Sequence, residues 1–157
     1  MATLRADTSA HASYALRSLR GLALGLGGNH VAAAESLYAI EGPDLDVPGR
    51  DAAAASPLDR LMGARWLEDA HKPAMADSLL VFTNSYYFTA EVFRTYQSTL
   101  MLAQLERSRI AETLGHNRDA IRYAQRFVAM YDMPPAAHRP LVAEAKERIA
   151  RLSKTER

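Results

Sequence analysis

The chain has 157 residues, of which 48% are hydrophobic and 24% charged, and its net charge is +1. This is the composition of an ordinary globular protein, and the absence of cysteine excludes disulfides, thiolate catalysis and cysteine-ligated zinc. No apolar run reaches the roughly 18–20 residues of a membrane span, and the N-terminal residues make a poor signal peptide. We therefore expect a cytoplasmic protein.

The apolar residues are mostly alanine and leucine, which favours helices over strands. Glycine and proline pairs then divide the chain into helical segments. The stretch 42–55 holds two prolines, two glycines and three aspartates, which predicts a surface loop. The pair Ser56-Pro57 predicts the start of the next helix, because a capping hydroxyl precedes a proline at the first helical position. Likewise, Asn29 and Asn117 are placed to begin helices. The resulting helical hairpins cover residues 8–41, 56–83 and 89–132, and a closing helix covers residues 137–152.

These hairpins repeat one pattern around their turns. The turn residues Gly28, His71 and Gly115 lie 43 and 44 residues apart. Seven residues before each turn, and again five residues after it, the side chain is small. A small residue on each helix of a pair lets the two backbones approach closely. The six positions are Gly21, Ala64 and Ser108 before the turns, and Ala33, Ala76 and Ala120 after them.

With these small residues, the run Gly-His-Asn-Arg-Asp-Ala at Gly115–Ala120 makes the chain resemble a tetratricopeptide repeat (TPR) protein. The resemblance is best over residues 105–131, and residues 115–152 also resemble the tail of repeat regions attached to large bacterial signalling proteins. The spacing is longer than the usual 34 residues, and Arg20, Gly63 and Arg107 stand where the family has a leucine. The resemblance implies an all-α fold over residues 1–157, with about three stacked antiparallel helix hairpins forming a single TPR-like α-solenoid domain and a C-terminal capping helix.

In such arrays the first helix of each pair lines a concave groove, which implies a non-catalytic scaffold that binds a peptide or a partner subunit. Arg65 and Arg109 occupy the same repeat position, and two guanidinium groups about 10 Å apart could hold the carboxylates of a peptide. Intramolecular pairs, such as Arg65 with Asp69 and Arg109 with Glu112, are the alternative interpretation. The groove residues predicted in this way are Leu61, Arg65 and Glu68 in the middle repeat, and Leu105, Arg109 and Glu112 in the third.

A second candidate site is a cluster of aromatic residues around a predicted loop-to-helix junction. Dense aromatic residues at such a place can form an exposed binding patch, or they can fill the gap between two hairpins. The cluster consists of Tyr86, Tyr87, Phe88, Phe93 and Tyr96.

The sequence contains no motif that predicts catalysis, a cofactor or a metal. His30, His71 and His116 fall at the three turns, and stacked repeats would place them roughly 10 Å apart, too far to share one ion. Arg118, Arg122 and Arg126 form a stripe on one helix, which is typical of a solvated outer face and could alternatively meet an acidic partner or nucleic acid. We expect no enzyme activity and no cofactor.

Two other functions are compatible with the sequence. The first helix carries leucine around much of its circumference, more than a single apolar stripe requires, which favours a structural or oligomerisation subunit of a larger assembly. Residues 101–157 hold 11 Lys/Arg and 7 Asp/Glu, whereas residues 1–100 hold 8 and 11. The basic C-terminal third leaves a regulatory domain that binds nucleic acid or an effector as a further alternative, although nucleic acid is the less expected partner because the whole chain is nearly neutral.

Overall fold

The computed structural model describes residues 10–38, 50–84, 90–131 and 133–155, and within these ranges the chain is helical with no strand. The prediction of an all-α fold is confirmed for this part of the chain. Contacts along the backbone divide the chain into two compact units, Met1–Tyr96 and Gln97–Arg157.

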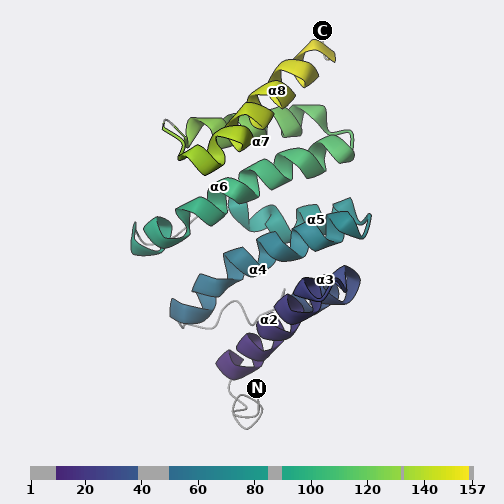
Figure 1. Ribbon diagram of the computed structural model, residues 1–157, viewed down its shortest axis with the longest axis vertical. Helices are drawn as coiled ribbons and strands as arrows, with labels where there is room; N and C mark the ends of the chain where they lie inside the picture. The colour runs from purple at the N-terminus through teal and green to yellow at the C-terminus, as the bar shows by residue number, and fades with distance from the viewer. Residues whose placement is uncertain (1–9, 39–49, 85–89, 132, 156–157) are drawn as a thin grey trace. The chain divides into compact units, whose positions relative to one another are not determined.

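The first unit contains two pairs of consecutive helices (Figure 1). In the first pair, α2 (Ala10–Leu26) packs on α3 (His30–Tyr38), and in the second, α4 (Arg50–Asp69) packs on α5 (Pro73–Leu80). A short 3-10 helix, η2 (Val81–Asn84), continues from α5. Both helices of the first pair also contact α4, so the two pairs pack together.

The second unit contains most of α6 (Ala90–Thr113), followed by α7 (Asn117–Ala129), the short helix η3 (Ala136–His138) and α8 (Arg139–Thr155). All three long helices contribute to its core, in which Leu105 of α6, Phe127 of α7 and Val142 of α8 pack in one buried cluster. Helix α8 therefore turns an apolar side inward. Its predicted position, 137–152, agrees with the observed helix to within a few residues at each end.

The three turns adopt one backbone conformation. Gly28, His71 and Gly115 all have positive φ angles, of 82°, 58° and 75°. Each turn donates the same two hydrogen bonds; in the last, the amide of Gly115 donates to the carbonyl of Glu112 at 2.9 Å and the amide of His116 to that of Ala111 at 2.8 Å. This is the Schellman helix end, which requires a left-handed residue and so favours glycine. The predicted turn positions are confirmed.

The small residues lie where the helices of each pair cross. All six are buried, which is the burial expected of positions where two helices meet. A Cβ atom on Gly21 of α2 would overlap the side chain of Leu37 on α3. In α6, the Ser108 hydroxyl donates a 2.8 Å hydrogen bond to the carbonyl of Ala120 on α7. The crossing thus depends on side chains that leave room for the facing backbone.

Glycine also determines how the two pairs of the first unit pack on each other. The Trp66 side chain of α4 lies against Gly25 of α2, where a Cβ atom would overlap the indole ring. Gly63 of α4 makes a similar close approach, because a Cβ there would lie 3.0 Å from Leu79 and 3.4 Å from Leu37. Gly63 stands where the tetratricopeptide pattern has leucine, and the close packing of α3 and α5 around it explains the difference.

Two predicted helix boundaries are wrong. Helix α4 begins at Arg50, so residues 50–55 are helical rather than part of a loop, and Pro57 lies inside the helix rather than at its first position. The alanines that precede Ser56 are strong helix formers, and their propensity outweighs the cost of a proline in the helix interior. Helix α7 is preceded by His116 as its capping residue and not by Asn117, and the His116 side chain makes no capping hydrogen bond. The rest of the predicted loop, residues 42–49, lies outside the described residues.

Candidate functional site

The predicted groove residues divide into buried leucines and partly exposed charged groups. Leu61 and Leu105 are only 2% and 1% exposed, so both side chains belong to the protein interior. Arg65 and Glu68 are half-buried on α4, and each of them has an interaction partner within the chain. Arg109 and Glu112 are also half-buried, and their partners come largely from α8.

Six charged side chains link α6 to α8, and we name them the α6–α8 network. The Arg109 guanidinium binds both oxygens of Glu144, with its Nε at 2.9 Å and its Nη2 at 2.6 Å. This two-pronged geometry is the strongest arrangement available to an arginine and a carboxylate. The remaining members are Glu106, Glu112, Arg148 and Arg151.

The other end of the network is centred on Glu112. Its Oε2 accepts a hydrogen bond from Arg148 Nε at 2.7 Å, and its Oε1 pairs with Arg151. Arg148 also donates from Nη1 to Glu144 at 3.1 Å, so the two carboxylates are joined through one guanidinium. The side chain of Arg148 is only 12% exposed, which makes this pairing part of the packing between the helices rather than a surface contact.

The arginines stabilise the charged form of both carboxylates. Hydrogen bonding from Arg151, and then from Arg148, lowers the pKa of Glu112 from 4.5 to about 2, although burial opposes this shift. The hydrogen bonds that Arg109 donates likewise lower the pKa of Glu144, again against the effect of burial. The carboxylate of Glu112 raises the pKa of Arg151 in return. The ion pairs of these two carboxylates therefore hold α8 on α6.

These contacts compete with the predicted binding of a peptide carboxylate by Arg109. Its Nη1 also donates to Glu106 at 3.1 Å, so this guanidinium already binds two carboxylates of its own chain. A partner would have to displace at least one of them. The partner residue Glu144 lies 35 positions away in sequence, and only the packing of α8 brings it near. The Glu144–Arg148 pair, one helical turn apart on α8, is the local part of this network.

The aromatic cluster cannot be placed. Tyr86, Tyr87 and Phe88 lie outside the described residues, and so do the side chains of Phe93 and Tyr96, although both residues fall within α6. Whether these residues form an exposed patch stays a prediction.

A different aromatic residue, Tyr123 of α7, has a contact that sequence analysis missed. The guanidinium of Arg107 lies over its ring at 4.3 Å from the ring centre, and that of Arg122 lies at 5.2 Å. Arg107 is 3% exposed and stands where the tetratricopeptide pattern has leucine. A cation over an aromatic face accounts for an arginine at this buried position. The departure from the leucine pattern, together with a tyrosine on the next helix, was the available signal.

The turn histidines have separate surroundings. His30 Nδ1 lies 2.9 Å from an Asp69 oxygen, and the His30 ring stacks on Trp66 with 6.2 Å between ring centres. His71 provides a left-handed turn residue, and His116 is exposed. Among the described residues, no group of three side chains that could hold a metal ion comes together.

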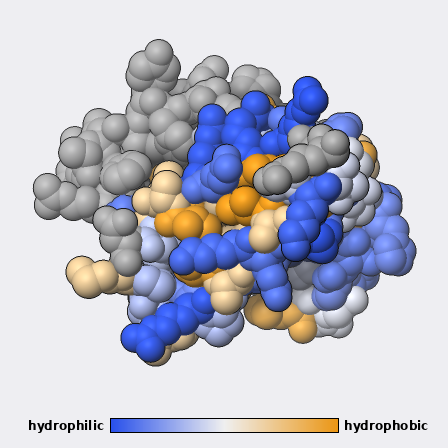
Figure 2. All heavy atoms as spheres, turned by 90° about the horizontal axis from the view of Figure 1, so that it is seen from above, coloured by the Kyte–Doolittle hydropathy of each residue, from blue (hydrophilic) through white to orange (hydrophobic). Residues whose placement is uncertain are grey.

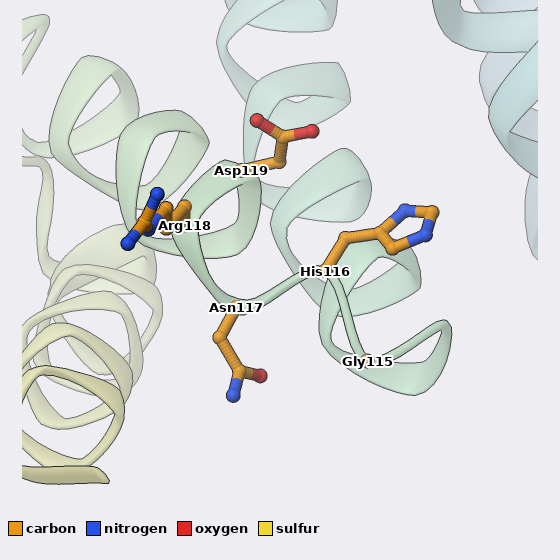
Figure 3. A pocket seen from close by; sticks show the side chains of 5 residues that line it. All are labelled: Gly115, His116, Asn117, Arg118 and Asp119. Atoms are coloured by element: carbon orange, nitrogen blue, oxygen red, sulfur yellow. The ribbon is translucent and has the colours of Figure 1, made fainter. Parts of the chain in front are cut away.

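A hollow of about 440 Å³ lies at the turn between α6 and α7, and it is lined by Gly115–Asp119. Figure 3 shows that the lining side chains diverge: His116 points away from Arg118, and Asn117 and Asp119 point in opposite directions. General acid–base catalysis requires groups that converge on one reacting atom, and this arrangement does not provide them. The hollow is thus a feature of the turn.

Comparison with protein-family models, with curated proteins and with known three-dimensional structures finds no match. Among the described helices, none is long and apolar enough to cross a membrane. The fold and the site together define an all-α protein of helix pairs whose best-formed polar cluster, the α6–α8 network, joins two of its own helices.

Proposed function

We propose that this protein is a non-catalytic interaction module, a TPR-like α-solenoid that binds a peptide or a partner subunit along the face of its first helices. The observation that carries the proposal is the threefold recurrence of one hairpin design. Each hairpin has a left-handed turn residue with the same pair of hydrogen bonds and a buried small residue on either side. Recurrent hairpins of this kind are the units of helical repeat proteins, which bind through extended surfaces.

The physical advantage of such a module is rigidity. The helix crossings are closely packed, as the contacts at Gly21 and Ser108 illustrate. A surface that is already ordered loses little conformational entropy when a partner binds. Binding energy is then not spent on ordering the protein itself.

Within the proposed groove, Arg65 on α4 is the residue to test first. Arg65 and Glu68 occupy the repeat positions of Arg109 and Glu112, and all four are half-buried and have interaction partners within the chain. Changing Arg109 would also disturb the α6–α8 network, of which Arg65 is not a member. A peptide carboxylate would be bound by Arg65 through a charge-assisted hydrogen bond.

A quantitative pulldown from native extract tests this function. Wild-type protein is compared with Arg65→Ala, and Arg126→Ala serves as the control, because it removes the same charge from an exposed position on α7. We expect specific partners to be depleted at least severalfold with Arg65→Ala and unchanged with Arg126→Ala, while circular dichroism shows equal helix content. Equal recovery with all three proteins would refute the groove.

A structural or oligomerisation subunit is the second candidate function, and the first unit holds the observation that favours it. Leu19 and Leu26 on α2 are 46% and 84% exposed, and Val31 on α3 is 44% exposed. Leu19 and Leu26 are two helical turns apart and therefore lie on one face of α2. Light scattering at increasing concentration separates the candidates: a monomer throughout would exclude self-association, and a Leu26→Glu variant should shift any oligomer towards monomer.

A further inference from the structure

Helix α8 has an outward face that differs from the side it turns to the core. Nine of its residues are exposed, and five of them, at spacings of four, three, four and four, form one stripe along the helix; the others are Pro140, Glu147, Arg151 and Thr155. The stripe alternates cations with small side chains, and we name it the α8 stripe: Arg139, Ala143, Lys146, Ala150 and Lys154. Figure 2 shows hydrophilic side chains over much of the coloured surface, with a hydrophobic area among them.

The three cations of the stripe have no ion-pair partner among the described residues, and four carboxylates of the same unit have other contacts. Glu112 and Glu144 bind the arginines of the α6–α8 network. Asp119 binds Arg122 at 2.9 Å. Glu147, at the edge of the stripe, acts on Arg151. Three cations are therefore exposed along α8, and Glu147 and Arg151 are exposed beside them.

We propose that the α8 stripe docks an acidic helical segment of a partner protein. Seven residues of helix advance about 10.5 Å, so Arg139 and Lys146 are separated by about the distance between glutamates two turns apart on a facing helix. Ala143 and Ala150 lie between the cations and add little bulk. A partner backbone can therefore approach closely at the alanines while its carboxylates reach the cations on either side.

The same observations disfavour the two other acidic partners, nucleic acid and an anionic membrane. A nucleic-acid strand carries a phosphate about every 3.4 Å along its axis, far denser than the cations of the stripe. A membrane-surface helix needs large apolar side chains beside its cations, and the stripe offers only alanine.

This inference concerns a surface outside the groove of the proposed function and does not depend on it. The test uses a stapled, alanine-rich helical peptide that carries glutamate on one face at every seventh residue. A peptide of identical composition with the glutamates distributed around the helix is the pattern control. Binding of the labelled peptides to the full chain is measured by fluorescence anisotropy at low salt and again at high salt, which screens such contacts.

Two variants that remove the same number of charges separate the stripe from net charge. Arg139→Ala/Lys146→Ala/Lys154→Ala removes the cations of the α8 stripe, and all three positions are exposed, so helix packing is preserved. The matched control removes three arginines from α7 instead, namely Arg118, Arg122 and Arg126. We expect the α8 variant to bind the patterned peptide about tenfold more weakly, since three exposed ion pairs each contribute a few-fold to affinity. The α7 variant should lose less than half of that effect.

Several results would overturn the proposal. Equal binding of the two peptides would show that their pattern is not read, and equal loss with both variants would attribute binding to net charge alone. Tighter binding of single-stranded DNA of the same charge would assign the surface to nucleic acid. No peptide binding at low salt would also reject the stripe as a docking site, provided that circular dichroism shows the wild-type helix content in every variant.

Discussion

Replacing Glu112 with glutamine tests whether the α6–α8 network determines the stability of the C-terminal unit. The substitution keeps the size of the side chain and removes its charge. It leaves Arg148, which is only 12% exposed, without one of its two carboxylate partners. Removing one partner of a well-buried ion pair is costly, because the remaining charge stays desolvated.

The magnitude follows from the pKa of Glu112. A fall from 4.5 to about 2 on folding corresponds to about 3 kcal/mol of preference for the charged form. The side chain is 25% exposed and Arg151 is more so, and solvent screening reduces the effect. We therefore expect Glu112→Gln to lower the free energy of unfolding of this unit by about 2 kcal/mol at pH 7.

The lowered pKa of Glu112 also determines how this stabilisation depends on pH. The folded-state pKa is lower than the unfolded-state value, so the stabilisation is fully present above about pH 4.5 and is lost as the pH falls towards 2. The penalty of Glu112→Gln should therefore disappear over this window. The second carboxylate, Glu144, titrates in both proteins, so the difference between them isolates Glu112.

Amide hydrogen exchange in α8 as a function of pH, supported by urea unfolding at pH 7, measures this difference. Glu147→Gln is the matched control: it makes the same chemical change at an exposed position of α8, and we expect an effect below about 0.5 kcal/mol. If Glu112→Gln were no more destabilising than the control, or equally destabilising at pH 2 and pH 7, the network would not hold α8 in the manner described.

Four further substitutions test the packing and the turns of the hairpins. Gly25→Ala should destabilise the N-terminal unit by about 1–3 kcal/mol, because the rigid Trp66 ring must move, and the emission of this single tryptophan should shift to the red. His71→Gly should stabilise the protein by about 0.5 kcal/mol and Gly115→Ala should destabilise it by about 1 kcal/mol, because both turns require positive φ. Urea unfolding should therefore show changes of opposite sign for these two variants. Ser108→Ala should cost about 1 kcal/mol by removing a buried hydrogen bond to the facing helix, and a neutral result would contradict that role.

The parts of the fold that sequence analysis predicted correctly are those with local causes. The turn at Gly115 could be located because a left-handed helix end requires glycine or a tolerant residue at one position. The helix start at Asn29 also has a local cause, because an asparagine side chain can accept a hydrogen bond from the first turn. Its side chain does accept one from the amide of Ala32 at 3.3 Å. Pro57 was misplaced because local rules rank a Ser-Pro start above an interior proline, whereas the alanines before it extend the helix backwards.

The site was less predictable, because its contacts depend on packing between distant segments. Arg109 could be identified as a strong carboxylate ligand, yet the choice between a partner and Glu144 rests on where α8 lies. Trp66 offered no indication that it would pack on Gly25, since the two residues share no periodic relation in the sequence. Residue type specifies what a side chain can bind, and tertiary structure decides which group is there to be bound.

Helix α8 carries a large residue where the first helices of the three hairpins carry a small one. The position 44 residues after Ser108 is Leu152, which is buried against Ala111, Ala120 and Tyr123. A leucine fills the space that a small residue leaves for a facing backbone, so α8 packs inward onto the hairpin before it and cannot be crossed there in the same way. Exchanging Leu152 for alanine should therefore loosen the packing of α8 on α6 and α7.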